Sequence, residues 1–189
     1  MSIAAGLAAD KDQPFQVEPA ASYPSKQTNQ NVTIAAVPYS TSEATKSPFG
    51  KTDPNKYGIL PVLLVIQNDT KQTLSLERIR VEYLTATGDK LQSTPPRDVP
   101  YIHGTGRPDY RTSPIPTVGG PRVKRSKNAL KSEVIDVRAF SARMLPPGQQ
   151  ASGFFYFQIA HRPPSRIYVT GLREAASGNE LFYFEIPVD

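Results

Sequence analysis

The chain has 189 residues and a formal net charge of +5, and it contains 19 prolines and no cysteine. This length suits one ordinary domain with residues left over for arms or loops. The absence of cysteine excludes a disulfide framework, thiolate chemistry and Cys-ligated zinc or iron–sulfur sites. No uncharged apolar run approaches the ~20 residues that a membrane-spanning helix needs, so we predict no transmembrane segment.

Residues 1–30 are predicted to form an extended, Pro-rich arm. Residues 3–9 are apolar and small, which suits either the remainder of a signal sequence or a flexible terminus. A segment of this composition buries too little surface to offset its ordering entropy unless it lies on another surface. Its large apolar side chains, Phe15, Val17 and Tyr23, are therefore the candidate contacts of the arm.

Two short elements are predicted after the arm. Residues 31–37 have the composition of a first strand, which Pro38 ends. Residues 42–47 can form one helical turn capped by Thr41 or Ser42.

Residues 57–83 predict a hairpin. Residues 60–66 are apolar without alternation, as in a strand that is buried on both faces. An Asn-Asp turn at 68–71 leads to residues 74–83, which alternate. The alternation shifts by one residue near Glu77, and a β-bulge there is the simplest explanation.

A short strand is predicted at 90–92, followed by a long surface loop, rich in proline and glycine, at about 93–131. The segment 134–145 fits either a helical face or the start of a strand, and we favour a short helix that ends before Pro146.

Three strands rich in aromatic and β-branched residues are predicted at 152–159, 166–172 and 180–186. With the earlier strands they indicate an all-β, antiparallel sandwich of six to eight strands, formed by residues 31–189 as a single domain. The aromatic clusters at 154–157 and 182–184 fit core packing better than a ligand groove, although alternation leaves half of these rings outside or under the arm.

Positive charge is concentrated in the long loop. Between His103 and Lys131 the chain has seven basic residues and one acid, a net +6, so the rest of the chain is at −1. This pattern is typical of a solvated loop or of a contact with an anionic lipid surface or acidic protein. Nucleic acid is disfavoured, since Tyr110 is the only aromatic residue among these charges. The candidate contacts are Arg122, Lys124, Arg125 and Lys127.

No sequence motif for catalysis, cofactor binding or metal binding is present, and we predict no catalytic residue, cofactor or metal. The two histidines, His103 and His161, are predicted to lie on the surface; a hydrolase site near either one is the rival interpretation. The sequons at Asn31 and Asn68 are interpreted as a strand start and a turn. Four carboxylates are placed where turns and strand ends hold solvated charges: Glu43, Asp53, Glu174 and Glu180.

The turn and strand pattern resembles immunoglobulin-like β-sandwich domains of bacterial exported proteins and lipoproteins. The residues that carry the resemblance are Val62–Asn68, Thr73–Leu76, Gly88–Lys90 and Leu145–Gly148 before Gly153–Phe157. It covers about 31–92 and 134–189 and leaves out the arm and the basic loop. It implies a location outside the cytoplasm and no catalysis, and it transfers no functional residues.

The function predicted from these observations is a non-enzymatic module in the bacterial periplasm or at the cell surface, with its signal sequence removed. It would associate with another envelope component or with copies of itself through its arm and sheet edges. The alternatives are an anionic-surface binder acting through residues 103–131 and a hydrolase with a site near His103 or His161.

Overall fold

The structure, a computed structural model, describes residues 15–102, 130 and 133–189. As predicted, it is mostly β: the described residues form 11 strands in three antiparallel sheets, with few helices. None of the helices in the described part of the chain combines the length and apolar character that a membrane crossing requires.

Two four-stranded sheets form the body of the molecule. Sheet A has the order β1 (Lys26–Asn29), β2 (Val32–Pro38), β3 (Leu60–Asn68) and β8 (Gln150–Phe157). Sheet C has the order β11 (Phe184–Pro187), β9 (Arg166–Thr170), β5 (Arg80–Leu84) and β6 (Lys90–Gln92). The small sheet B joins β10 (Arg173–Glu174), β4 (Leu74–Ser75) and β7 (Met144–Leu145).

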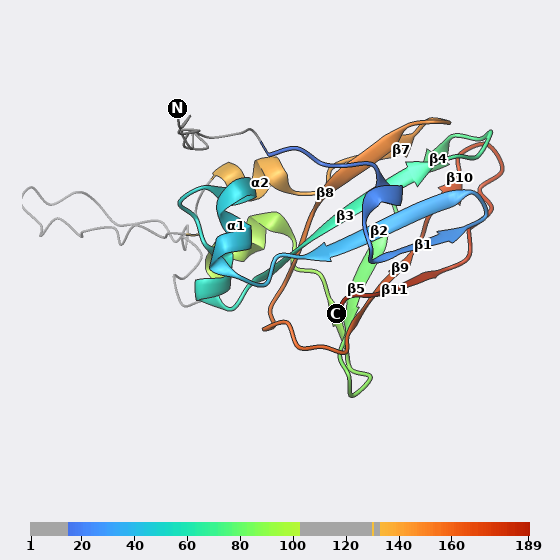
Figure 1. Cartoon of the computed structure of the whole chain (residues 1–189). Coiled ribbons are helices and arrows are strands. Elements are labelled where there is room, and N and C mark those ends of the chain that lie inside the picture. The colour runs from blue at the N-terminus through green and yellow to red at the C-terminus, as the bar shows by residue number, and fades with distance from the viewer. Residues whose placement is uncertain (1–14, 103–129, 131–132) are drawn as a thin grey trace, which may run out of the picture.

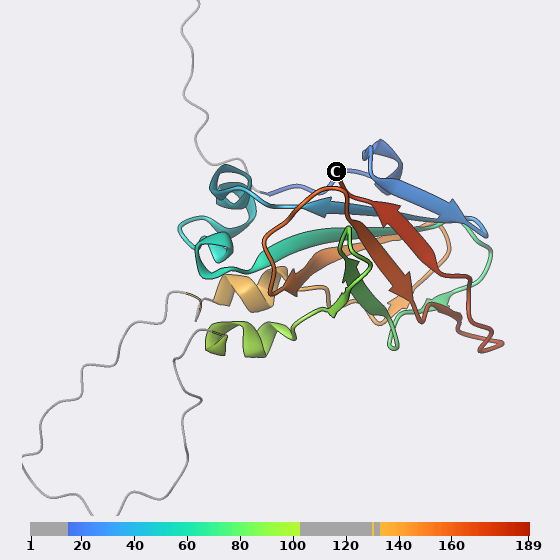
Figure 2. The same ribbon diagram turned by 90° about the horizontal axis from the view of Figure 1, so that it is seen from below.

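Strand β3 is buried on both faces, which explains its lack of alternation. Val62, Leu64 and Ile66 belong to the core between sheets A and C. Leu63 and Val65 belong to a second core on the other face of sheet A. Sheet A is therefore the middle layer of the molecule, with sheet C on one side and helices and arm on the other (Figures 1 and 2).

Apart from η1 (Ala20–Ser22), the described helices gather at one end of the molecule (Figure 1). They are α1 (Ser42–Phe49), α2 (Glu133–Arg138) and the 3₁₀ helices η2 (Pro54–Tyr57) and η3 (Pro96–Tyr101). Thr41 caps α1 as predicted, since its hydroxyl accepts a hydrogen bond from the Ala44 N–H at 3.1 Å. Phe49 of α1 and Ile135 of α2 are buried against sheet A, so these helices extend its apolar packing.

The predicted hairpin at 57–83 is wrong, although its turn is present. Both edges of β3 are taken by β2 and β8, so the chain cannot fold back to pair with it. The side-chain amide of buried Asn68 donates to the carbonyls of Gln72 and Leu145, both at 2.9 Å, and directs the chain out of sheet A. The segment expected as one alternating strand instead supplies β4 to sheet B and β5 to sheet C.

A change of sheet therefore replaces the predicted bulge near Glu77. Here the chain passes so close to Gly171 that a Cβ on this glycine would lie 2.0 Å from the Arg78 carbonyl oxygen. Gly171 also has a φ of +81°, which favours glycine. The shift in alternation marks the point where the chain leaves one sheet for the other.

The segment 134–145 contains both of the elements that its pattern allowed. Helix α2 ends at Arg138, earlier than predicted, and β7 follows at Met144–Leu145. The cause is the close approach to β8: the Phe140 N–H donates to the Phe154 carbonyl at 3.1 Å. A Cβ on Gly153 would lie 2.4 Å from the Phe140 Cα, so only glycine admits this crossing.

The arm ends earlier than the predicted boundary at residue 30. Residues 26–29 form β1, which pairs with β2 along its whole length. Before β1, a single 3₁₀ turn, η1 (Ala20–Ser22), buries Ala20 completely against sheet A. The polar sequence of β1 hid this strand, because an edge strand with an exposed side needs few apolar residues.

The edges of sheet A and the β11 edge of sheet C are already in contact with other parts of the described chain. Side chains of β1 and its turn bond the backbone around β11: Gln27 accepts from the Glu185 N–H at 2.5 Å, and Gln30 accepts from the Phe182 N–H at 3.0 Å. On the opposite side, Thr94 and Ala139 form bridges to β8. Strand addition by another chain therefore meets few free backbone groups at these edges.

Candidate functional site

His161 lies in the connection between β8 and β9, where sheet A passes into sheet C. Its Nδ1 atom is 3.0 Å from the Tyr83 hydroxyl and 3.4 Å from the Ser165 hydroxyl. Tyr83 comes from β5 and is buried, and its oxygen also accepts the Arg162 N–H at 3.3 Å. The structure thus places this predicted residue beside two hydroxyl groups.

The other hydrogen bonds of these hydroxyls favour one assignment of donor and acceptor. Ser165 donates its proton to the Val188 carbonyl at 3.0 Å, and it is only 2% exposed. Tyr83 has accepted a backbone N–H, so its own proton is free to go to Nδ1 of a neutral His161. Burial lowers the pKa of His161 below 6.5, and the negative charge of Asp189 opposes that shift in part, so the neutral form is favoured.

This arrangement differs from that of a serine hydrolase. A catalytic histidine uses one ring nitrogen for the nucleophile and the other for a carboxylate. Here both hydroxyls face the same nitrogen, and Ser165 is buried with its proton committed to a carbonyl. A hollow of about 450 Å³ lies beside Tyr83 and Arg162. The His161 cluster supports a structural role, which is to fasten the β8–β9 connection to β5.

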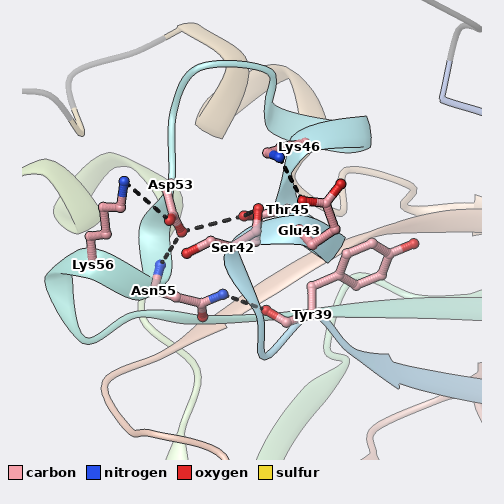
Figure 3. A network of polar contacts seen from close by, with 8 residues as sticks. All are labelled: Tyr39, Ser42, Glu43, Thr45, Lys46, Asp53, Asn55 and Lys56. Carbon is pink, nitrogen blue, oxygen red and sulfur yellow. Dashed lines mark hydrogen bonds and ion pairs between the residues drawn. The ribbon is translucent and has the colours of Figure 1, made fainter. Parts of the chain in front are cut away.

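A second polar network joins α1 and η2 (Figure 3). Asp53 caps η2 by accepting the Asn55 N–H at 3.1 Å, and it accepts the Thr45 hydroxyl of α1 at 3.3 Å. Asn55 in turn donates to the Tyr39 carbonyl at 2.9 Å. Burial, with a smaller contribution from Tyr23, raises the pKa of the Tyr39 hydroxyl to about 12. The network ties α1 and η2 to the end of β2.

The other predicted carboxylates have local partners. Glu43 pairs with Lys46 on the exposed side of α1, and Glu180 pairs with Arg173 at 2.8 Å. Glu174 accepts the Ser177 hydroxyl at 2.6 Å. Among the described residues, no group of three His, Asp or Glu side chains could hold a metal ion.

The candidate arm contacts lie on their own chain. Phe15, Val17 and Tyr23 are half-buried against the second core of sheet A. The Phe15 ring packs on Tyr39 and Phe154, with centroid distances of 6.3 and 5.7 Å. The arm is fixed further by Gln150, which accepts the Ala20 N–H at 2.9 Å and donates to the Glu18 carbonyl at 3.2 Å. Within a single chain, this part of the arm covers sheet A.

The predicted basic contacts, Arg122, Lys124, Arg125 and Lys127, lie outside the described residues, as does His103.

No candidate residue was named from the sequence on the outer face of sheet C. Its inward positions, such as Val81, Ile167 and Ile186, are buried, so the alternate residues face away from the core. No described element covers this face (Figure 2). Tyr168 of β9 packs against Tyr183 with a centroid distance of 5.3 Å, and the Lys90 ammonium lies 4.5 Å from the Tyr168 ring centroid.

Tyr183 is 52% exposed, and the neighbouring Phe182, just before β11, is 70% exposed, which is unusual for aromatic side chains in a folded domain. The cluster 182–184 was predicted to pack in the core or, by alternation, to leave part of its rings outside. Phe184 is buried, whereas Phe182 and Tyr183 precede the first residue of β11 and are exposed. Alternation in 166–170 was the sequence signal that places Tyr168 on the outer face.

Strand register arranges this face into three rows. Two of them span all four strands, and the third, Arg80 with Thr170, spans only β5 and β9. The acidic row consists of Gln92, Glu82, Tyr168 and Glu185, which are paired across β6, β5, β9 and β11. The basic row beside it consists of Lys90, Leu84, Arg166 and Pro187. Arg166 and Glu185 join the rows through an ion pair of 2.6 Å. The face thus combines aromatic and aliphatic area with ordered charges of both signs.

No protein-family model matches the chain, and a search of curated proteins finds no match.

Proposed function

We propose that the chain is a non-enzymatic binding module of immunoglobulin-like type, which acts outside the bacterial cytoplasm and binds a protein partner through the outer face of sheet C. The fold part is supported by two antiparallel sheets that share one core and by connections that pass between them. The location rests on the resemblance to exported bacterial domains.

The observation that carries the proposal is the exposed aromatic group on an uncovered sheet. Tyrosine and arginine are enriched among residues that dominate the free energy of protein binding, and such residues are surrounded by charged or polar neighbours. Tyr168, Tyr183 and Arg166 lie together in that arrangement. The contacts already made along β1, β11 and β8 favour binding through this face over strand addition at those edges.

The His161 cluster also supports a binding module over a hydrolase. Its serine is buried and bonded to a carbonyl, and its histidine is favoured in the neutral form by burial. These groups hold a connection in place and present no accessible nucleophile.

A photo-crosslinking amino acid at Tyr183 tests the proposal. Val137, on α2 and 77% exposed, is the matched control at the helical end. We expect a discrete crosslinked product from position 183 in an extract of the native organism, absent from position 137. Excess wild-type chain should compete for it, and excess Tyr168→Ala chain should not. Equal products at both positions, or competition by both chains, would contradict the proposal.

A second candidate is binding to an anionic surface through residues 103–131, which the net charge of +6 in that segment favours. Binding to vesicles rich in anionic lipid should then weaken steeply with salt, because the Debye length shortens. Changing Arg122, Lys124, Arg125 and Lys127 to Gln should abolish it, and unchanged binding would exclude this candidate.

A further inference from the structure

The rows on the outer face of sheet C have the charge pattern of a surface that recognises itself. Acids occupy one row, with Glu82 and Glu185 on either side of Tyr168. Bases occupy the next, with Lys90 and Arg166 on either side of Leu84. Successive outward residues on a strand are about 7 Å apart, so the two rows are distinct lines of opposite charge, which the Arg166–Glu185 ion pair bridges at one point.

We propose that a second copy of the chain docks on this face, sheet C against sheet C, about a twofold axis that runs along the rows and midway between them. This inference rests on the proposed function and names the partner. Rotation about such an axis exchanges the two rows, so the acidic row of each copy lies over the basic row of the other. The same patch serves both copies, as in the isologous interfaces of most homodimers.

The axis also brings complementary side chains of the two β9 strands together. Tyr168 of each copy lies opposite Arg166 of the other, and tyrosine faces attract guanidinium groups. Glu82 forms no ion pair with the rest of the described chain, so its charge is available to the basic row of a partner. Leu84 and the exposed ring of Tyr183 add apolar area to the contact.

The competing face-to-face arrangement is disfavoured by the same pattern. A twofold axis parallel to the strands leaves each row over its own copy, which sets acids against acids and bases against bases. Juxtaposed like charges oppose association, so the rows select one geometry as well as permitting it.

The test uses the full chain and two charge reversals. The first reverses the acidic row, Glu82→Lys with Glu185→Lys, and the second reverses the basic row, Lys90→Glu with Arg166→Glu. Sedimentation velocity from micromolar to near-millimolar concentration should show reversible dimers of the wild type. Each reversed chain alone should associate about tenfold or more weakly, because its two rows then carry one sign. An equimolar mixture of the two should recover a mixed dimer.

The matched control reverses the exposed pair of α1, Glu43→Lys with Lys46→Glu, and should leave the dimer unchanged. Wild type that stays monomeric at every concentration overturns the inference, as does a mixture that fails to recover association. A monomeric wild type with a position-specific crosslink at Tyr183 would overturn self-docking and leave the proposed function standing. A monomer without that crosslink would overturn both.

Discussion

The outer face of sheet A and the outer face of sheet C belong to similar four-stranded antiparallel sheets and have opposite surroundings. On sheet A, outward residues such as Leu63, Val65 and Phe154 are apolar, and helices and arm cover them. On sheet C the outward residues are charged or aromatic, and no described element lies over them. The difference follows from the sequence pattern of the strands. Where both faces of a sheet are apolar, as in sheet A, both are covered; where apolar and polar residues alternate, as in sheet C, one face stays open.

The largest expected effect compares a phenylalanine on the covered face of sheet A with an exposed phenylalanine just before β11 of sheet C. Phe154 is buried under Phe15, Tyr39 and Phe49, whereas Phe182 is exposed. We expect Phe154→Ala to lower the free energy of unfolding by about 3–5 kcal/mol, from lost burial and the cavity left behind. Phe182→Ala should change it by less than about 0.5 kcal/mol. Urea unfolding followed by circular dichroism measures both, and equal losses would erase the distinction between the faces.

The next effect tests whether packing of the arm on sheet A stabilises the fold. Phe15 is half-buried, with the Arg138 guanidinium 5.0 Å from its ring centroid. Phe15→Ala should cost about 1–2 kcal/mol of unfolding free energy, roughly half of the value for a fully buried ring. Limited proteolysis should also cut the variant faster between residues 15 and 25. An unchanged cleavage rate would show that the arm does not depend on this contact.

A pair of carboxylates gives a smaller contrast. Asp53 caps η2 beneath the helices, and Glu82 lies on the open face without an ion pair in the described chain. Asp53→Ala should cost about 1 kcal/mol through loss of the cap. Glu82→Ala should stay within about 0.5 kcal/mol. Thermal unfolding of dilute protein measures both variants. A larger loss of unfolding free energy from Glu82→Ala than from Asp53→Ala would contradict a structural role for Asp53 and a binding role for Glu82.

The sequence predicted what depends on local pattern. The burial of β3, the cap at Thr41 and the turn at Asn68 follow from side chains that act on their neighbours. Strand pairing depends on distant residues, and this is why the hairpin prediction failed: β8, about 90 residues further along, takes the edge that the hairpin required. The strand at Lys26–Asn29 is polar, and its pairing with β2 leaves no apolar signal.

The candidate site was harder to predict than the fold. His161 stood out as one of two histidines. Ser165 lies four residues further along, just before β9, but Tyr83 comes from β5, 78 residues earlier, and no motif links the three. The two rows on sheet C exist only through register across four strands. Single residues such as Glu82 and Lys90 therefore carry no signal in the sequence alone.

The smallest expected effect lies at His161, where the chain passes from the covered sheet to the open one. Because burial lowers its folded pKa below 6.5, the unfolded chain binds a proton at a higher pH than the folded chain does. The resulting stability is complete above pH 6.5, and it declines as the pH falls from there toward the folded pKa. Urea midpoints between about pH 5.5 and 7.5 should therefore drop toward the acid side. His161→Gln should flatten this slope, whereas Glu43→Gln, on exposed α1, should leave it unchanged. A slope that survives His161→Gln would assign the pH dependence to another group and leave the β8–β9 connection insensitive to protonation.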